Sequence, residues 1–186
     1  RVLGAADYGA FSYALTIAAF LTIFSDFGIS PVLTKETVRD SRQDYFGAAV
    51  ALKFILIALN GVVLLAVIPL FSRVEAANAL FPFVLFIFAF DSLRELGFGI
   101  NRALERMERE AYVKIFLNAA VAGLGFFALS SVATPASLMW AYAVGTGFGL
   151  AATIWMLRTH VKTIFSRIRF DLILPLFKAA VPIGLL

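Results

Sequence analysis

Five ionisable residues interrupt stretches of the chain that are otherwise apolar: Asp26, Lys53, Asp91, Arg94 and Glu95. A charged side chain at the centre of a bilayer costs at least about 2.5 kcal/mol on insertion scales, so each needs an opposite charge or a water-filled cavity. Lysine and arginine in such a place would attract an anionic group. The carboxylates could tune these cations or exchange a proton or another cation, which makes transport the chemistry to consider.

Three of the five residues share one helical face, because Asp91, Arg94 and Glu95 are three and four positions apart. Arg94 can therefore bridge to Asp91 and keep further hydrogen-bond donors free. We expect this face to point toward protein rather than lipid. Two interpretations are open: a polar cavity, open to the cytoplasm, in which Arg94 and Lys53 bind an anionic head group, or internal ion pairs with Lys53 snorkelling to the boundary.

Asp26 and Asn60 have further expected roles in this candidate site. Asp26 is the candidate for coupling transport to H⁺ or Na⁺. Asn60 could line the cavity as a substrate-binding residue or simply hydrogen-bond between helices. We expect no catalytic residue, metal or cofactor, since the chain has no cysteine and its lone histidine, His160, has no second histidine at ligand spacing. The GTGFG sequence at 145–149 has small residues at the spacing of close helix packing.

The apolar stretches that must position these residues are long enough to cross a bilayer. Apolar residues make up 61% of the 186 residues and charged residues only 15%, and the mean hydropathy is +0.91. The runs are apolar on all sides, unlike the alternating strands of a membrane barrel. The sequence therefore predicts an all-α, polytopic transmembrane helix bundle in a single domain over 1–186, with spans at 8–33, 45–71, 79–100, 111–132 and 135–157 and an incomplete span from 172.

Basic residues alternate between the connecting segments and predict the orientation. They concentrate in three of these segments: Lys35, Arg39 and Arg42; Arg102, Arg106 and Arg109; and Arg158, Lys162, Arg167 and Arg169. By the positive-inside rule these three segments are cytoplasmic. The same grouping into short loops argues against nucleic acid as a partner. The last segment also has the pattern of an amphipathic stretch lying on anionic lipid.

A family resemblance begins at the first residues. The sequence RVLGAADYG, followed by an apolar helix ending in Asp26-Phe27-Gly28, resembles the second-helix region of the polysaccharide (O-antigen and exopolysaccharide) flippases. These belong to the multidrug/oligosaccharidyl-lipid/polysaccharide exporter superfamily. The final PLFKAAVPIGLL, with Lys178 and Pro182, is similar to the start of that family's seventh helix. The resemblance implies that the chain is a fragment, spans two to six plus part of the seventh, within the N-terminal bundle of a MATE-like flippase fold.

The resemblance also implies a function and partners. Such a protein would move an undecaprenyl-pyrophosphate-linked oligosaccharide across the prokaryotic cytoplasmic (inner) membrane by alternating access, for lipopolysaccharide or exopolysaccharide biosynthesis. Its partners would be membrane lipids, the lipid-linked oligosaccharide and other polysaccharide assembly proteins. It would not be an enzyme.

Other functions remain open. The five ionisable residues sum to two minus three, or minus one, and an acid-rich cavity would also suit a cation-coupled multidrug exporter of the same superfamily. A structural subunit packed beside another transporter is a further alternative. A membrane-embedded glycan enzyme is disfavoured by the short loops and the lone histidine.

Overall fold

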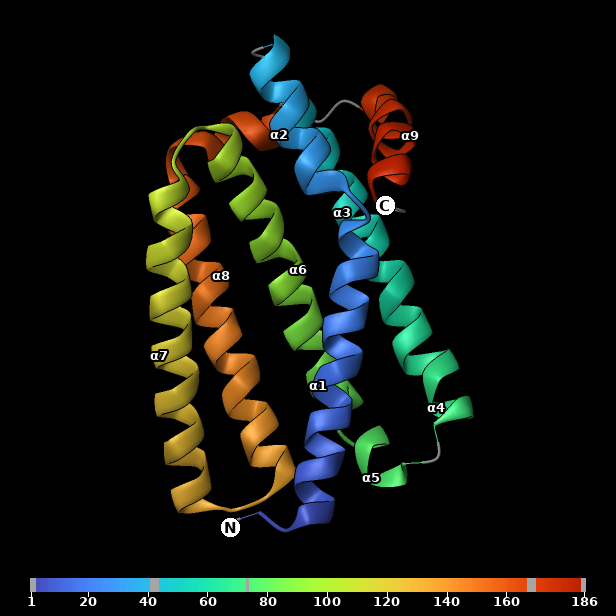
Figure 1. The fold of residues 1–186 in the computed structure, drawn as a ribbon, viewed down its shortest axis with the longest axis vertical. Helices are drawn as coiled ribbons and strands as arrows, with labels where there is room; N and C mark the ends of the chain where they lie inside the picture. Colours follow the sequence, from blue (N-terminus) through green and yellow to red (C-terminus); the bar gives the residue numbers. More distant parts are fainter. Residues whose placement is uncertain (1–2, 41–43, 73, 167–169, 185–186) are drawn as a thin grey trace.

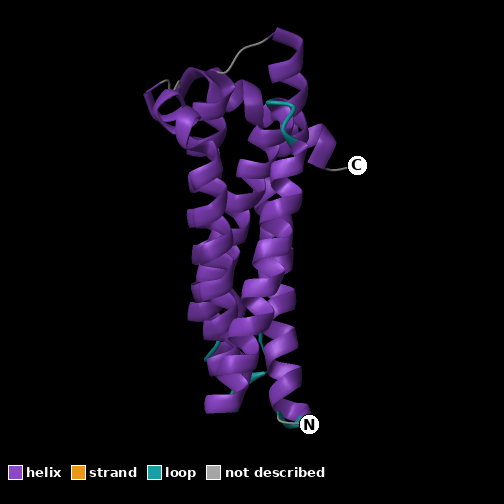
Figure 2. Cartoon of the chain, turned by 90° about the vertical axis from the view of Figure 1, so that its left-hand side faces the viewer, coloured by secondary structure: helices purple, strands orange, loops and turns teal. Residues whose placement is uncertain are grey.

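The computed structural model describes residues 3–40, 44–72, 74–166 and 170–184, and it contains only helices and short connections in that part of the chain. The long helices lie side by side along one axis, with the N-terminus at one end of the bundle (Figures 1 and 2). The predicted all-α bundle is confirmed.

The first apolar stretch, predicted as a span over 8–33, forms two helices rather than one continuous helix. Helix α1 covers Ala5–Asp26 and α2 covers Ile29–Asp40. Between them Phe27 and Gly28 take positive φ values of 38° and 81°. The Phe27 amide donates to the carbonyl of Ile23 at 3.1 Å, which ends α1 in a left-handed cap. The chain direction therefore changes directly after Asp26.

The last described helix packs against this break. Helix α9, Ile173–Gly184, follows a 3₁₀ turn at Phe170–Leu172 and contacts α2 and α3. A Cβ placed on Gly28 would lie only 2.6 Å from the carbonyl oxygen of Ala180. Gly28 thus has two reasons to lack a side chain, its positive φ and the close backbone of α9.

The second stretch is one helical rod with a local change of winding. Helix α3, Asp44–Val62, continues through a π-helical turn at Val63–Val67 into α4, Ile68–Phe71. A short connection then includes α5, Glu75–Asn78.

Three long helices complete the bundle. Helix α6 covers Phe81–Ala103, with Pro82 in its first turn as expected for a residue without an N–H. Helix α7 covers Met107–Ser131, and α8 covers Pro135–Ser166. Helix α6 packs against α1, α2, α3 and α8, whereas α7 packs mainly on α8. Helix α6, which carries three of the five ionisable residues, is therefore the central helix of the bundle (Figure 1).

In the part of the chain that the structure describes, four helical segments are long and apolar enough to cross a membrane: Ala5–Glu36, Tyr45–Phe71, Met107–Ser131 and Pro135–His160. The predicted span at 79–100 is not among these candidates. Its helix, α6, has 23 residues and hence sufficient length. Asp91, Arg94 and Glu95 fall in its middle and make it too polar to qualify by composition.

Many large apolar side chains face outward. Phe126 is 79% exposed and Leu70 is 80% exposed, and aromatic and aliphatic residues of α1, α3 and α7 are exposed in the same way. In water such a surface would be unfavourable, but in a bilayer it is the surface that lipid covers.

Candidate functional site

The end of α1 holds the first of two buried ion pairs. Lys53 of α3 has no exposed surface, and its Nζ lies 3.1 Å from Oδ1 of Asp26. The same carboxylate oxygen accepts a hydrogen bond of 2.7 Å from the hydroxyl of Ser30, in the first turn of α2. Three helices therefore meet at Asp26. The alternative of a snorkelling Lys53 is wrong, because its ammonium is paired inside the bundle.

The second pair lies within α6. Arg94 Nη1 donates to Asp91 Oδ1 at 2.5 Å, and Arg94 Nη2 lies 3.9 Å from Glu95 Oε1. The exposed fractions of the three side chains are 10% for Arg94, 20% for Asp91 and 34% for Glu95. The predicted bridge from Arg94 to Asp91 is confirmed, and so is the expectation that this face points toward protein.

Arg94 retains hydrogen-bonding capacity despite this pairing. Its buried Nε has no hydrogen-bond partner among the described residues. Its guanidinium carbon lies 5.7 Å from the ring centre of Phe98, within the range of a cation–π contact. Its Cδ lies 3.6 Å from a Cβ built on Gly149, so α8 confines the stem of the side chain. Arg94 is thus held in place, and its Nε–H donor is unused.

The two pairs belong to one polar region. The hydroxyl of Ser25, next to Asp26, contacts the hydroxyl of Ser92, next to Asp91. Glu95 is close enough to Lys53 to contribute to its electrostatic environment. The carboxylates outnumber the cations by three to two, as the sequence predicts, and Glu95 has the longest of the three ion-pair distances, 3.9 Å to Arg94.

Asn60 does not join this region. Its Nδ2 donates to the carbonyl of Leu56, one turn earlier in the same helix, at 2.9 Å. This hydrogen bond lies within α3 and not between helices, and the cavity-lining role of Asn60 stays a prediction. A polar side chain in an apolar helix can satisfy itself locally, and the sequence offers no way to distinguish that case.

The glycines of GTGFG have the packing role that the spacing predicts. A Cβ on Gly145 would lie 2.5 Å from Val121 of α7, and one on Gly149 would lie 3.0 Å from Leu117. A Cβ on Gly147 would lie 3.3 Å from the ring of Phe90 on α6. These glycines allow α7 and α6 to approach α8 closely.

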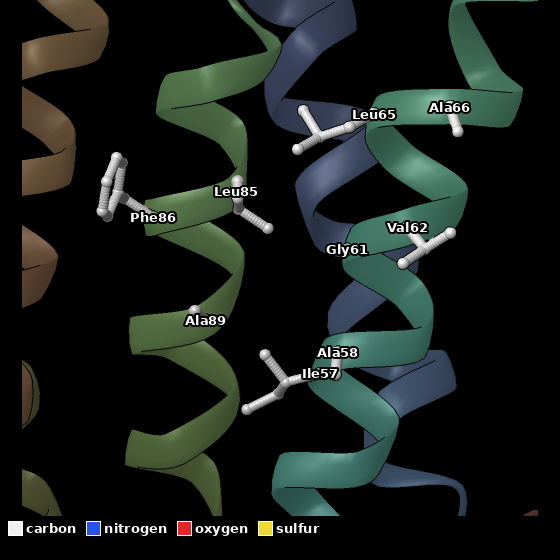
Figure 3. A pocket seen from close by; sticks show the side chains of 9 residues that line it. All are labelled: Ile57, Ala58, Gly61, Val62, Leu65, Ala66, Leu85, Phe86 and Ala89. Carbon is white, nitrogen blue, oxygen red and sulfur yellow. The ribbon is translucent and has the colours of Figure 1, made fainter.

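One cavity is apolar and lies apart from Arg94. It has a volume of about 600 Å³ and lies between α3, with its π-helical turn, and α6. Figure 3 shows Ile57 and Leu85 projecting into the space between the two helices, with Gly61 on the α3 side. None of the five ionisable residues lines it. π-Helical turns are frequent at functional sites.

Sequence reasoning missed some of the residues around the site. Ser30 is an unremarkable serine in the sequence, and only the helix break at Phe27–Gly28 brings it to Asp26. Glu110 accepts hydrogen bonds from Arg102 at 2.6 and 2.7 Å and from Lys114 at 2.6 Å, which ties α6 to α7. The spacing of Glu110 and Lys114 at i and i+4 is a signal that could have predicted half of this network.

Some sequence predictions fall where the structure gives no description. Arg1, Arg42, Arg73, Arg167 and Arg169 lie outside the described residues, as do the side chains of Arg39 and Lys162. The predicted amphipathic stretch and part of the charge asymmetry therefore stay predictions. Among the described residues, no group of three or more potential ligands is placed to hold a metal ion.

A comparison with known protein families matches residues 1–186 to the family described as polysaccharide biosynthesis protein. The chain belongs to this family. No curated protein and no solved structure gave a match. The family match agrees with the resemblance predicted from Arg1 to Gly28. Together with the apolar helices, it makes the chain a membrane protein of polysaccharide biosynthesis, a role related to polysaccharide transport.

Proposed function

We propose that this polysaccharide biosynthesis protein is a flippase, which moves an undecaprenyl-pyrophosphate-linked oligosaccharide from the cytoplasmic to the outer leaflet of the inner membrane by alternating access. The observation that carries the proposal is the pair of buried cations, Lys53 and Arg94, at the centre of an apolar bundle in a member of this family. Buried charges in a membrane are costly, so their presence calls for a function.

The ion pairs provide a means of switching. In the described arrangement the carboxylates of Asp26 and Asp91 neutralise the two cations. The pyrophosphate of a substrate would compete for the same guanidinium and ammonium groups, and the unused Nε of Arg94 is a further donor that it could engage once the helices around this buried atom open. Release of Asp26 or Asp91 would free a carboxylate to take up H⁺ or Na⁺. Substrate binding and ion coupling would thus share one set of residues.

The apolar cavity between α3 and α6 supports the lipid part of the proposal. Its lining of aliphatic and aromatic side chains suits a hydrocarbon chain and offers nothing to a sugar. Val62 and Leu65, which line the cavity, are exposed, and this exposure supports a position of the cavity beside the bilayer. The lipid tail of the substrate could remain in this groove or the adjoining membrane while the head group crosses.

The test separates the role of Arg94 in folding from its role in transport. In cells that depend on this protein for surface polysaccharide, Arg94→Gln should abolish export, but it also leaves Asp91 buried and unpaired. The double variant Asp91→Asn/Arg94→Gln removes both charges and should restore protein abundance, because the cost of breaking a buried pair comes largely from the remaining charge. Export, measured as surface glycan, should stay lost.

Two controls complete the experiment. Lys35→Gln removes an exposed charge from α2 and should leave export unchanged. If the double variant exports glycan as well as the unaltered protein does, the ion pair is structural and the flippase proposal loses its supporting observation.

A cation-coupled exporter of the same superfamily is the second candidate. The observation in its favour is Glu95, a carboxylate 34% exposed and 3.9 Å from Arg94. Substitution of Glu95 by Gln should then reduce efflux of a cationic drug, while substitution of Lys53 or Arg94 should matter little. The reverse pattern is expected of the flippase.

A further inference from the structure

A separate pocket lies at the end of the bundle opposite the N-terminus, where α7 begins beside the later part of α8. Its volume is about 320 Å³, and it has no residue in common with the two ion pairs. The residues that line it are Arg106, Arg109, Trp155, Met156, Arg158 and Thr159. Three arginines thus line one small cavity.

Two of these arginines, Arg109 and Arg158, are held by neutral groups. Arg109 Nη1 donates to the main-chain carbonyl of Met156 at 2.7 Å. The guanidinium carbon of Arg158 lies 5.0 Å from the ring centre of Trp155. None of the ion pairs described for this part of the chain involves Arg106, Arg109 or Arg158. Within the described ranges, no carboxylate is therefore paired with the arginines of the pocket.

Phosphate is the anion that this arrangement fits best. A guanidinium presents planar N–H donors that match phosphate oxygens, and an arginine with one N–H engaged keeps others free. Thr159 is a further polar residue of the lining, and its hydroxyl lies 2.9 Å from Nδ1 of His160.

The position of the pocket indicates where the phosphate would come from. Trp155 is 62% exposed, and Tyr112 on the neighbouring α7 is 64% exposed. The neighbouring Thr153 and Leu157 are buried against α6 instead. The pocket therefore faces outward from the bundle, and its aromatic residues are of the kind that lie at head-group depth.

We infer that this pocket binds the phosphate head group of an anionic phospholipid of the surrounding bilayer. Basic pockets between transmembrane helices at the cytoplasmic side are suited to such head groups. The pyrophosphate of the proposed substrate shares this chemistry. The outward position, away from Lys53 and Arg94, favours a bilayer lipid.

The test measures binding of four probes to the purified full chain in a neutral detergent. The probes are phosphatidylglycerol, phosphatidylcholine, undecaprenyl pyrophosphate and inorganic phosphate, and native mass spectrometry reports the bound fraction. We expect phosphatidylglycerol to bind in preference to the other three. Arg106→Gln and Arg158→Gln should each weaken it about fivefold, whereas Lys35→Gln, with a charge removed at the same end of the bundle, should not.

Four outcomes would overturn the inference. Equal binding of phosphatidylcholine, or no effect of either arginine substitution, would show that the charges do not select a lipid. Tighter, arginine-dependent binding of undecaprenyl pyrophosphate would assign the pocket to the substrate instead. Equally tight binding of inorganic phosphate would make it a free-anion site. Circular dichroism of each variant checks that its helices are intact. Arg106→Lys, which keeps the positive charge, should bind phosphatidylglycerol more tightly than Arg106→Gln does.

Discussion

Lys53 and Asp26 are 27 positions apart in the chain, yet each accounts for the other's presence in an apolar bundle. The ammonium of Lys53 is fully buried, and the carboxylate of Asp26 also accepts a hydrogen bond from the hydroxyl of Ser30. Arg94 and Asp91 form the second pair from positions only one turn apart. Local pairing could be predicted from the spacing, whereas the pair between helices could not.

The Lys53–Asp26 pair gives a prediction at this scale. Lys53→Met should lower the free energy of unfolding by about 3–5 kcal/mol, because it leaves the Asp26 carboxylate inside the bundle without its cation. The double variant Asp26→Asn/Lys53→Met should recover most of that loss. Thermal unfolding of the purified proteins in detergent measures both, with the exposed Lys35→Met as a control expected to behave like the unaltered protein. A double variant less stable than the single one would contradict this explanation.

Helices in this chain are arranged by glycines as much as by apolar contacts. Gly28 lets the chain turn after Asp26 and lets α9 approach, while Gly145 and Gly149 bring α7 onto α8. Gly97 plays the same part for α6 and α8, since a Cβ there would lie 2.3 Å from Thr153. The helix that holds Arg94 is positioned by these close approaches.

Gly28→Ala should disturb the docking of α9 onto the α1–α2 break. The substitution places a Cβ at a φ of 81° and against the backbone of Ala180, which cannot move without moving α9. We expect a stability loss above about 1 kcal/mol and new labelling of a cysteine placed at Leu176, which is 1% exposed in the intact structure. Gly9→Ala is the matched control, because nothing lies within 4 Å of its Cβ. Unchanged protection of position 176 would mean that Gly28 does not control α9.

Gly145→Ala should separate α7 from α8. Its Cβ would meet Val121 at 2.5 Å, including backbone atoms of Val121 at 3.2 Å, so the side chain alone cannot relieve the contact. A loss of about 1–3 kcal/mol in the free energy of unfolding is expected, as for other overpacked contacts. Gly123→Ala, on α7 with open space around its Cβ, should cost nothing by comparison. Equal melting temperatures for the two variants would exclude a packing role for Gly145.

The whole bundle has its described basic side chains mainly at one end. Lys35, Arg102, Arg106, Arg109 and Arg158 belong to segments at the end opposite the N-terminus (Figure 1). The connection between α4 and α6 lies at the other end, with Glu75 in α5. Positive charge is retained on the cytoplasmic side of membranes, which predicts the orientation of the entire chain.

Single cysteines test this orientation directly, because the chain has no cysteine of its own. A membrane-impermeant maleimide added to intact cells should label Glu75→Cys and not Glu105→Cys. Opening the cells should make Glu105→Cys reactive, since Glu105 is exposed. Labelling of both positions from outside would contradict the topology and, with it, the cytoplasmic placement of the phospholipid pocket.

Composition and pattern alone determined the fold class, the starts of the long helices to within a few residues and the Arg94–Asp91 bridge. These follow from local physics: apolar length, helical spacing and the need to satisfy the backbone in lipid. Only the tertiary structure decided the helix break at Phe27–Gly28, the partner of Lys53, the apolar character of the cavity between α3 and α6, and the grouping of Arg106, Arg109 and Arg158. Each of these depends on contacts between helices far apart in the chain. The type of a residue and its local spacing do not specify which distant helix it will contact.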